Sequence, residues 1–439
     1  MNINKAVTQW LTKTKLPLFT IFAVLAAFCT YSCMYAFRKP FAVATYEGLE
    51  FWGIDYKILL IVAQVLGYTL SKFLGIKIVS EAGTKIRGVS ILILIGLAEI
   101  ALLGFALTPA PYNIIFLFFN GLPLGMVWGL VFSYLEGRRV TEILGAGLSI
   151  SFIFSSGFVK TVGAIVMQDW GFSEFWMPFI TGGLFAIPLL LFVWMLERLP
   201  APSALDEELR TKREPMNGKQ RKQLFLAFAP GLILLIVVYA LLTAFRDFRD
   251  NFAAEIWQAV GYGDSPEIFT ATEIPISLAI LIMMSLVFLV KDNAKALMVN
   301  HLIIFAGIVL VGVSTMAFQS RMIGPELWMI LVGLGLYMGY VPFNSIFFDR
   351  FIAAFQYISN VGFLIYLADA FGYMGSVGIM FYKNFGNAKM SWLNFFISSS
   401  YVMAVVGAVF TLLSMYYFAQ KHKAWKQDDE VVVTNEGIA

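Results

Sequence analysis

Long stretches of apolar residues alternate with short polar segments along the whole chain. A helix that crosses a lipid bilayer needs roughly 20 predominantly apolar residues, and stretches of this length recur throughout. Most of them contain Gly, Pro or other small residues, which membrane helices tolerate where they pack together. The pattern predicts an all-α membrane protein with twelve transmembrane helices, centred near residues 27, 67, 98, 124, 154, 186, 235, 279, 306, 337, 365 and 405.

The composition differs from that of soluble proteins. Hydrophobic residues fill 59% of the 439 positions and charged residues only 13%, whereas soluble domains carry about 25% charged residues. The sequence has no phosphate-binding glycine loop, no G-x-S-x-G elbow and no H-E-x-x-H motif. Its two histidines, His301 and His422, are too far apart for a zinc-binding pattern. We therefore expect no enzymatic activity, no catalytic residue, no metal and no cofactor.

Basic residues are distributed unevenly between alternate loops. If both termini lie inside, the inner segments hold 21 of the 31 Lys and Arg residues. The positive-inside rule then predicts an integral protein of the cytoplasmic (inner) membrane with both termini in the cytoplasm. The outer segments hold eight basic residues: Arg38, Lys39, Lys57, Arg246, Arg249, Arg321, Lys383 and Lys389.

One long polar segment between the spans divides the chain. It covers residues 198–223 and is rich in Lys, Arg and Pro, which is typical of a solvated cytoplasmic linker. It separates an N-terminal half of six predicted helices, residues 1–197, from a C-terminal half, residues 224–420, and residues 421–439 form a cytoplasmic tail. The expected partners are the lipid bilayer and a small anionic molecule, with no nucleic acid, and the chain is expected to be a monomer.

The two halves repeat short motifs at nearly the same spacing. A shift of 208 positions aligns Ala36-Phe37-Arg38 with Ala244-Phe245-Arg246, in the first and seventh helices. A shift of 212 positions aligns Gly121-Leu122 with Gly333-Leu334, in the fourth and tenth helices. Parallel repeats of six helices are the arrangement of the two major facilitator halves, so the sequence predicts two six-helix pseudo-symmetric halves of this fold.

Each repeat places an arginine and tyrosines on one helical face. Tyr31, Tyr35 and Arg38 are spaced i, i+4, i+7, and Tyr239 and Arg246 repeat the outer spacing. Arginine presents a planar fork that fits phosphate or carboxylate oxygens, and a cation near the membrane is costly without such a role. These five residues are predicted to bind an anionic substrate. The alternative is that both arginines snorkel to the outer headgroups.

Charged residues within the spans give further candidates. Lys72 is either a third cation for the substrate or a residue that snorkels inward. Lys160 either contacts the substrate or pairs with a buried carboxylate, for which Asp369 is one candidate. Asp369 itself is predicted to be a coupling residue, whereas Glu99 is expected to be a buried, hydrogen-bonded group.

Acidic residues close to Arg246 predict ion pairs. Glu273 is expected to pair with Arg246 or Arg249. Asp247 and Asp250 form either a surface ion-pair cluster or an outer gate. Glu273 and Asp250 are accordingly predicted to serve coupling or gating.

Residues 35–41, Tyr35-Ala36-Phe37-Arg38-Lys39-Pro40-Phe41, resemble the end of the first helix in the organophosphate:phosphate antiporters of the major facilitator superfamily. Residues 67–75 and 371–377 resemble the second and eleventh helices of the same family, with one residue inserted in the second. The resemblance implies that Arg38 and Arg246 grip a substrate phosphate. It also implies that Lys39 and Lys72 add positive potential.

The sequence departs from that family at two places. The family usually has Ser-Asp-Arg after the second helix, where this chain has Ser80-Glu81-Ala82. The family's histidine on the fifth helix is missing, and Ser151, Phe154 or Lys160 occupies the region. Proton linkage through that histidine therefore does not carry over, and the substrate is expected to differ.

These features predict a secondary active transporter. It would move a small organic anion, an organophosphate, by alternating access, in exchange for phosphate. One alternative is a proton-coupled symporter of a sugar or carboxylate with Asp369 as the titrating group. A second alternative is a membrane receptor that binds a sugar phosphate without transporting it.

Overall fold

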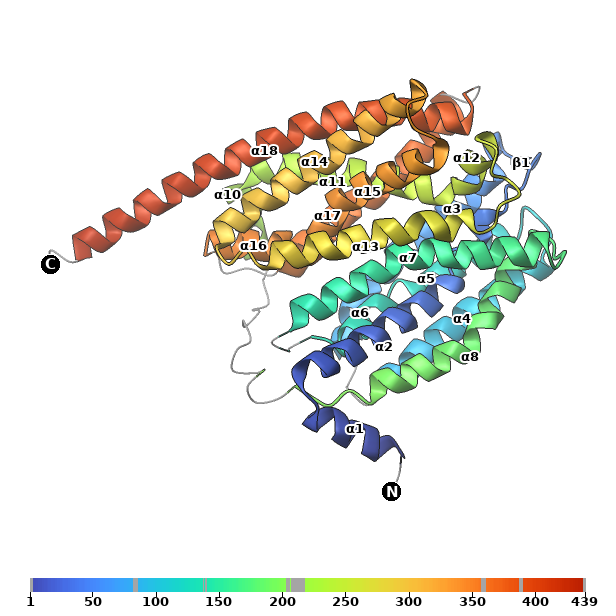
Figure 1. Ribbon diagram of the computed structural model, residues 1–439, viewed down its shortest axis with the longest axis horizontal. Helices are drawn as coiled ribbons and strands as arrows, with labels where there is room; N and C mark the ends of the chain where they lie inside the picture. Colours follow the sequence, from blue (N-terminus) through green and yellow to red (C-terminus); the bar gives the residue numbers. More distant parts are fainter. Residues whose placement is uncertain are drawn as a thin grey trace. The chain divides into compact units, whose positions relative to one another are not determined.

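A computed structural model describes residues 3–81, 86–136, 138, 140–202, 206, 218–356, 361–386 and 390–436 (Figure 1). Most of these residues are helical. Two short strands, β1 (Glu50–Phe51) and β2 (Ile54–Asp55), form an antiparallel hairpin in which Glu50 pairs with Asp55. Most of the predicted linker, together with Ala82 and Lys389, lies outside the described residues.

Each predicted span coincides with a helix. Within the described residues, eleven helices are long and apolar enough to cross a membrane. The span predicted near residue 67 lies in α3, which is 26 residues long and is not one of the eleven. The helices that hold the spans are α2 (Leu16–Ala36), α3 (Tyr56–Glu81), α4 (Arg87–Leu107), α5 (Ile114–Leu124) with α6 (Val127–Phe132), α7 (Thr141–Gln168), α8 (Met177–Glu197), α11 (Ala229–Asn251), α13 (Ile268–Phe288), α14 (Asn293–Gln319), α15 (Pro325–Ser345), α17 (Val361–Phe381) and α18 (Trp392–Glu436).

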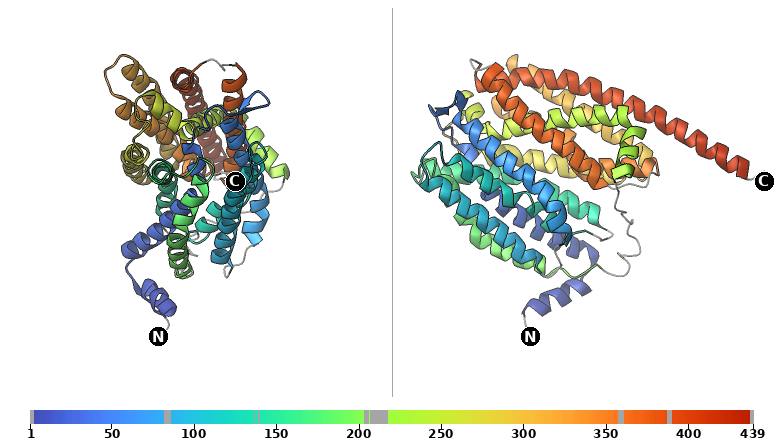
Figure 2. Two further views of the ribbon diagram at one scale, coloured as in Figure 1. Left: turned by 90° about the vertical axis from the view of Figure 1, so that its right-hand side faces the viewer. Right: turned by 180° about the vertical axis from the view of Figure 1, so that it is seen from behind.

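One compact unit comprises Met1–Arg210, Phe248–Leu281 and Met380–Phe395. Its core packs α2 against α7 and α8, and both α3 and α4 against α5 (Figure 2). Glycine allows the closest approach, since a Cβ atom on Gly67 of α3 would lie 2.1 Å from the carbonyl oxygen of Phe118 on α5. The unit also contains α1 (Ile3–Lys13), η1 (Pro40–Val43), α12 (Ala253–Ala259) and η2 (Tyr382–Gly386).

The other compact unit comprises Thr211–Asp247, Ile282–Ile379 and Phe396–Ala439. Here α14 packs against α15 and against the short helix α16 (Phe347–Ala354), and α10 (Gly218–Ala227) precedes α11. Four helices, α11, α13, α17 and α18, contribute residues to both units. The helix α18 ends at Glu436, so it continues into the residues predicted as a cytoplasmic tail.

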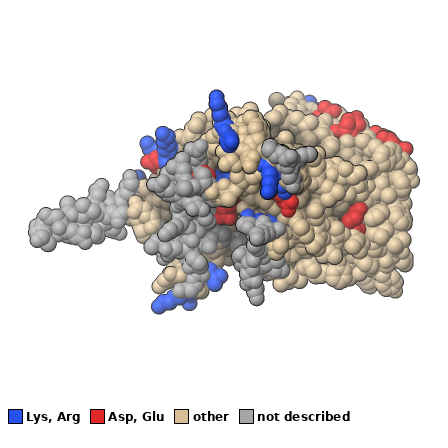
Figure 3. All heavy atoms as spheres, turned by 90° about the horizontal axis from the view of Figure 1, so that it is seen from below, with Lys and Arg blue, Asp and Glu red and all other residues tan. Residues whose placement is uncertain are grey.

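Large apolar side chains are exposed along several spans. Ile187 and Leu190 on α8 are 80% and 56% exposed, and Ile282 on α13 is 63% exposed. Much of the face drawn in Figure 3 is likewise neither basic nor acidic. Soluble proteins rarely expose apolar surface on this scale, whereas a surface in contact with lipid requires it.

Candidate functional site

Arg38 lies in the turn that follows α2, and its guanidinium stacks on an aromatic ring. The centre of the guanidinium lies 3.9 Å from the ring centroid of Tyr68 on α3 and 5.9 Å from that of Tyr35. The ammonium nitrogen of Lys72 lies 5.6 Å from the same Tyr68 ring, and the rings of Tyr31 and Tyr35 are in edge contact at 5.5 Å. The structure therefore brings Tyr31, Tyr35, Arg38 and Lys72 together around Tyr68.

Two buried amide side chains hold the backbone at Arg38. Gln64 donates through its Nε2 atom to the carbonyl oxygen of Arg38 at 2.9 Å and to Oδ1 of Asn120 at 2.8 Å. Asn120 in turn donates to the carbonyl oxygens of Phe37, at 2.8 Å, and Ala98, at 3.1 Å. Because buried backbone groups need partners, these amides fix the turn from which the Arg38 side chain extends.

Arg246 has a similar aromatic contact in the other unit. Its guanidinium lies 3.9 Å from the ring centroid of Tyr340 on α15 and forms an ion pair with Asp247 at 2.7 Å. Ser376 on α17 donates to the other oxygen of Asp247 at 2.8 Å. The sequence predicted that Asp247 belongs either to a surface ion-pair cluster or to an outer gate. The structure pairs it with the adjacent Arg246 and buries it, so the surface location is wrong.

Tyr239 and Asp369 form a buried hydrogen bond. The Tyr239 hydroxyl donates to Oδ1 of Asp369 at 2.5 Å, and Asn344 donates to the Tyr239 hydroxyl at 3.2 Å. The Tyr239 ring also stacks on Tyr340, with 5.3 Å between centroids. Asp369 thus has a tyrosine partner rather than Lys160, the partner that the sequence suggested, because α11 brings a hydroxyl within reach of its carboxylate.

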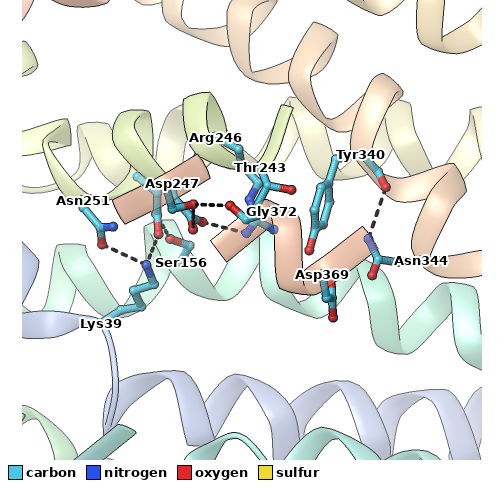
Figure 4. Close-up of polar contacts among 12 residues, drawn as sticks. Lys39, Ser156, Thr243, Arg246, Asp247, Asn251, Tyr340, Asn344, Asp369 and Gly372 are labelled. Atoms are coloured by element: carbon cyan, nitrogen blue, oxygen red, sulfur yellow. Dashed lines mark hydrogen bonds and ion pairs between the residues drawn. The ribbon is translucent and has the colours of Figure 1, made fainter. Parts of the chain in front are cut away.

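Lys160 and Lys39 both pair with Asp250. Each ammonium group contacts a different oxygen of the Asp250 carboxylate, and Ser156 donates a hydrogen bond to it as well. Lys39 also donates to Oδ1 of Asn251 at 3.0 Å (Figure 4). Lys39 and Lys160 are 6% and 3% exposed, so both lysines are buried. We refer to Lys39, Ser156, Lys160, Asp250 and Asn251 as the Asp250 cluster.

Two further ion pairs lie in the same unit. Arg249 pairs with Glu273 at 2.7 Å, which confirms one of the two partners expected for Glu273. Lys57 pairs with Glu255 of α12 at 2.5 Å and donates to the carbonyl oxygen of Ala42 at 2.8 Å. Burial raises the pKa of the Glu255 carboxyl, although the ammonium group of Lys57 opposes this shift.

Tyr68 and Tyr340 were missed by sequence reasoning. The shift of 208 positions that relates the two arginines moves Tyr68 onto Ile276, so the two tyrosines are not repeats of each other. The sequence around a tyrosine in an apolar span does not predict which residue the tyrosine contacts. Only the packing of α3 near the end of α2, and of α15 on α11, reveals the contacts.

A cavity of about 430 Å³ lies between α10, α11 and α17. None of the predicted site residues lines it. Its walls are formed by Arg221, Lys222, Phe225, Ile233, Ile236, Val237, Phe363, Leu367 and Phe371.

Comparison with known proteins identifies the fold. Residues 40–421 match the family described as "Family of unknown function (DUF5690)", and no curated protein matches the sequence. The crystal structure of a D-xylose-proton symporter is similar with a TM-score of 0.61 and 16% identity, over 91% of this chain and 97% of that chain. The peptide transporter POT, in complex with sulfate, is similar with a TM-score of 0.60 and 14% identity, over 96% of this chain and 99% of that chain.

These similarities confirm the predicted fold class. The chain is an integral membrane protein with the all-α fold of the major facilitator superfamily. At 14–16% identity the solved structures identify the fold, and the chemistry of the site must be argued from its own residues.

Proposed function

We propose that this chain, which belongs to the DUF5690 family, is a secondary active transporter of a small organic anion, an organophosphate that it exchanges for phosphate. The observation that carries the proposal is the shared setting of Arg38 and Arg246. Each guanidinium lies 3.9 Å from the centroid of a tyrosine ring. Stacking on a ring restrains the plane of a guanidinium and so orients its fork of N–H donors, which suits two-point binding of phosphate oxygens.

The charges favour exchange over transport of a neutral solute. A guanidinium group loses much of its hydration when a carrier closes around it, and this loss is unfavourable unless an anion compensates for it. A bound phosphate or phosphate ester would supply that compensation. The loaded carrier would then interconvert between its two states more readily than the empty one, as obligatory exchange requires.

The Asp250 cluster favours a gating role for some of the predicted cations. Lys39 and Lys160 are both committed to Asp250, so we assign them to the gate rather than to direct substrate contact. Arg38 and Lys72 remain candidate substrate cations. Arg246 is a third, which would exchange its contact with Asp247 for the substrate. The rings of Tyr31 and Tyr35 lie beside Arg38, and the ring of Tyr239 stacks on Tyr340, which contacts Arg246.

Proteoliposomes loaded with phosphate test this proposal. The wild-type protein should take up labelled phosphate only when phosphate or a sugar phosphate is present inside. Arg38→Lys and Arg246→Lys keep the charge but lose the fork, and a charge-assisted hydrogen bond is worth about 1.5–3 kcal/mol. Each variant should therefore slow exchange about 10- to 100-fold. Arg321→Lys, at an exposed position outside the proposed site, is the control.

Full exchange by both lysine variants would contradict the assignment of the arginines. Binding of a sugar phosphate without any flux would support the alternative of a receptor. Both outcomes are measurable with the same purified protein.

A second candidate function is proton-coupled symport. It is favoured by the buried hydrogen bond between Tyr239 and Asp369. Uptake of a sugar or carboxylate driven by a pH gradient, and lost in Asp369→Asn, would identify this mechanism. Phosphate exchange that is unaffected by Asp369→Asn would exclude a coupling role for that residue.

A further inference from the structure

Glu99 is an acidic residue within one of the most apolar helices. It lies in the span Arg87–Leu107, whose mean hydropathy is 2.5. Its Oε2 atom is buried and has no hydrogen-bond partner among the described residues. The sequence predicted a hydrogen-bonded group, and for this oxygen the prediction is wrong.

Two adjacent glycines of α8 make room for the carboxyl group. A Cβ atom on Gly182 would lie 2.3 Å from Oε2 of Glu99, and one on Gly183 would lie 3.7 Å from Oε1. The same Cβ atom on Gly182 would lie 3.0 Å from the ring of Phe37. The carboxyl group therefore fits in a notch between α4 and α8 that a larger residue at position 182 would fill.

Among the described residues, no Lys or Arg faces this notch from the helices that pack most closely on α4. These are α5, α6 and α8, and α5 and α6 carry no charged residue. The one charged residue of α8 is Glu197, which lies against Gly88, about three helical turns from Glu99. Arg87, at the start of α4, donates to the carbonyl oxygen of Ser133. Arg38 follows Phe37, but its guanidinium stacks on Tyr68.

An ionised carboxylate in such a notch would be strongly disfavoured. A charge within the membrane is costly unless a counter-charge or water compensates for it, and a neutral carboxylic acid avoids most of this cost. We propose that Glu99 is a proton-binding site that holds its proton while the notch between α4 and α8 is closed. Binding is a simple transfer, in which the carboxylate accepts a proton from water and becomes a neutral acid.

The position of Glu99 connects this site with Arg38. Asn120 donates to the carbonyl oxygens of both Ala98 and Phe37, the residues that immediately precede Glu99 and Arg38. Ionisation of Glu99 would require the α4–α8 notch to admit water, and the shared amide would transmit that change to the turn that carries Arg38. This coupling rests on the proposed function. Because ionisation of Glu99 would disturb the turn that carries Arg38, the protonated form is the one that exchanges substrate.

The proton can be tested without measuring transport. The infrared spectrum of the purified protein, in a detergent without ester groups, should contain a protonated-carboxyl band at neutral pH that is weaker in Glu99→Gln. Glu47→Gln, at an exposed loop position, should leave the band intact. An unchanged band in Glu99→Gln would overturn the proposal.

Chemical labelling of the wild-type protein gives a second readout that needs no variant. A hydrophobic carbodiimide reacts with a protonated carboxyl group in an apolar setting, and peptide mass spectrometry then locates the adduct. Modification of Glu99 but not of Glu47 is the expected result. Labelling that spares Glu99 would refute the assignment even if Glu99→Gln failed to fold.

Transport measurements then test the coupling separately. Above the ionisation midpoint of Glu99, the protonated fraction falls about tenfold per pH unit, and wild-type exchange should fall with it. Glu99→Gln should exchange at a rate that does not change over the same range. A protonated Glu99 in a protein without phosphate exchange would contradict the proposed function and leave the proton site intact. Exchange with equal pH dependence in wild type and Glu99→Gln would overturn the coupling.

Discussion

Arg249 and Glu273 form a buried ion pair, with 2.7 Å between Nη1 and Oε1. The two side chains are 6% and 9% exposed, and they join the end of α11 to α13. Removal of one partner from a buried pair leaves an uncompensated charge, which typically costs about 3–5 kcal/mol. We expect Glu273→Gln and Arg249→Met to lower the unfolding temperature in detergent, and the double variant to be more stable than either. A double variant that loses the sum of both effects would show that the two residues act independently.

The Asp250 cluster joins one carboxylate to two ammonium groups. Asp250→Asn should therefore be more harmful than Lys39→Gln, since it leaves two buried cations without their carboxylate. We expect a lower unfolding temperature for Asp250→Asn and partial recovery in Asp250→Asn/Lys160→Met. If the cluster is a gate, the same variants should also alter the rate of exchange in vesicles. Equal unfolding temperatures for Asp250→Asn and Lys39→Gln would argue against the conclusion that the Asp250 carboxylate compensates both ammonium groups.

Variants of Tyr68 and Tyr340 can separate the contribution of each aromatic ring to substrate affinity from that of its hydroxyl group. A cation–π contact is worth about 0.5–2 kcal/mol, which corresponds to about a 2- to 30-fold change in affinity. Tyr68→Phe keeps the ring face and should retain substrate affinity, whereas Tyr68→Leu should lose affinity within this range. The pair Tyr340→Phe and Tyr340→Leu should behave in the same way. Titration with phosphate or a sugar phosphate measures the effect, and equal affinities for the Phe and Leu variants would count against it.

Asp55 lies outside the membrane spans and should make the stability of the protein depend on pH. Its carboxylate accepts hydrogen bonds from the backbone N–H groups of Lys57, at 2.9 Å, and Ile58, at 3.4 Å, so it caps the start of α3. Burial nevertheless raises the pKa of Asp55 above its ordinary value. The folded protein therefore binds this proton more tightly than the unfolded chain does. The resulting stability is present at low pH and is lost as the pH rises through the raised pKa.

Two variants separate the charge of Asp55 from its capping role. Asp55→Asn keeps an acceptor for the helix start and should remove this part of the pH dependence of unfolding. Asp55→Ala should in addition cost about 1 kcal/mol through the lost cap. Thermal unfolding between acidic and neutral pH checks both, and an unchanged pH dependence in Asp55→Asn would contradict the pKa assignment.

Much of the fold follows from local sequence. Apolar runs such as those around residues 98 and 306 are long enough to span a bilayer, and each forms a helix in α4 and α14. Hydropathy suffices because a chain in lipid must satisfy its backbone hydrogen bonds within each segment. The parallel repeat of Arg38 and Arg246 also pointed to the correct superfamily fold.

The partners of the charged residues did not follow from the sequence. Lys160 was assigned alternatives that included Asp369, yet its partner is Asp250, 90 positions away in the chain. Glu99 was expected to be hydrogen-bonded, yet its Oε2 atom has no partner among the described residues. Apolar periodicity specifies which segments become helices, because that choice depends on each segment and the surrounding lipid. The tertiary structure alone decides which polar groups meet, because the rotation and depth of each helix are set by side-chain packing against its neighbours.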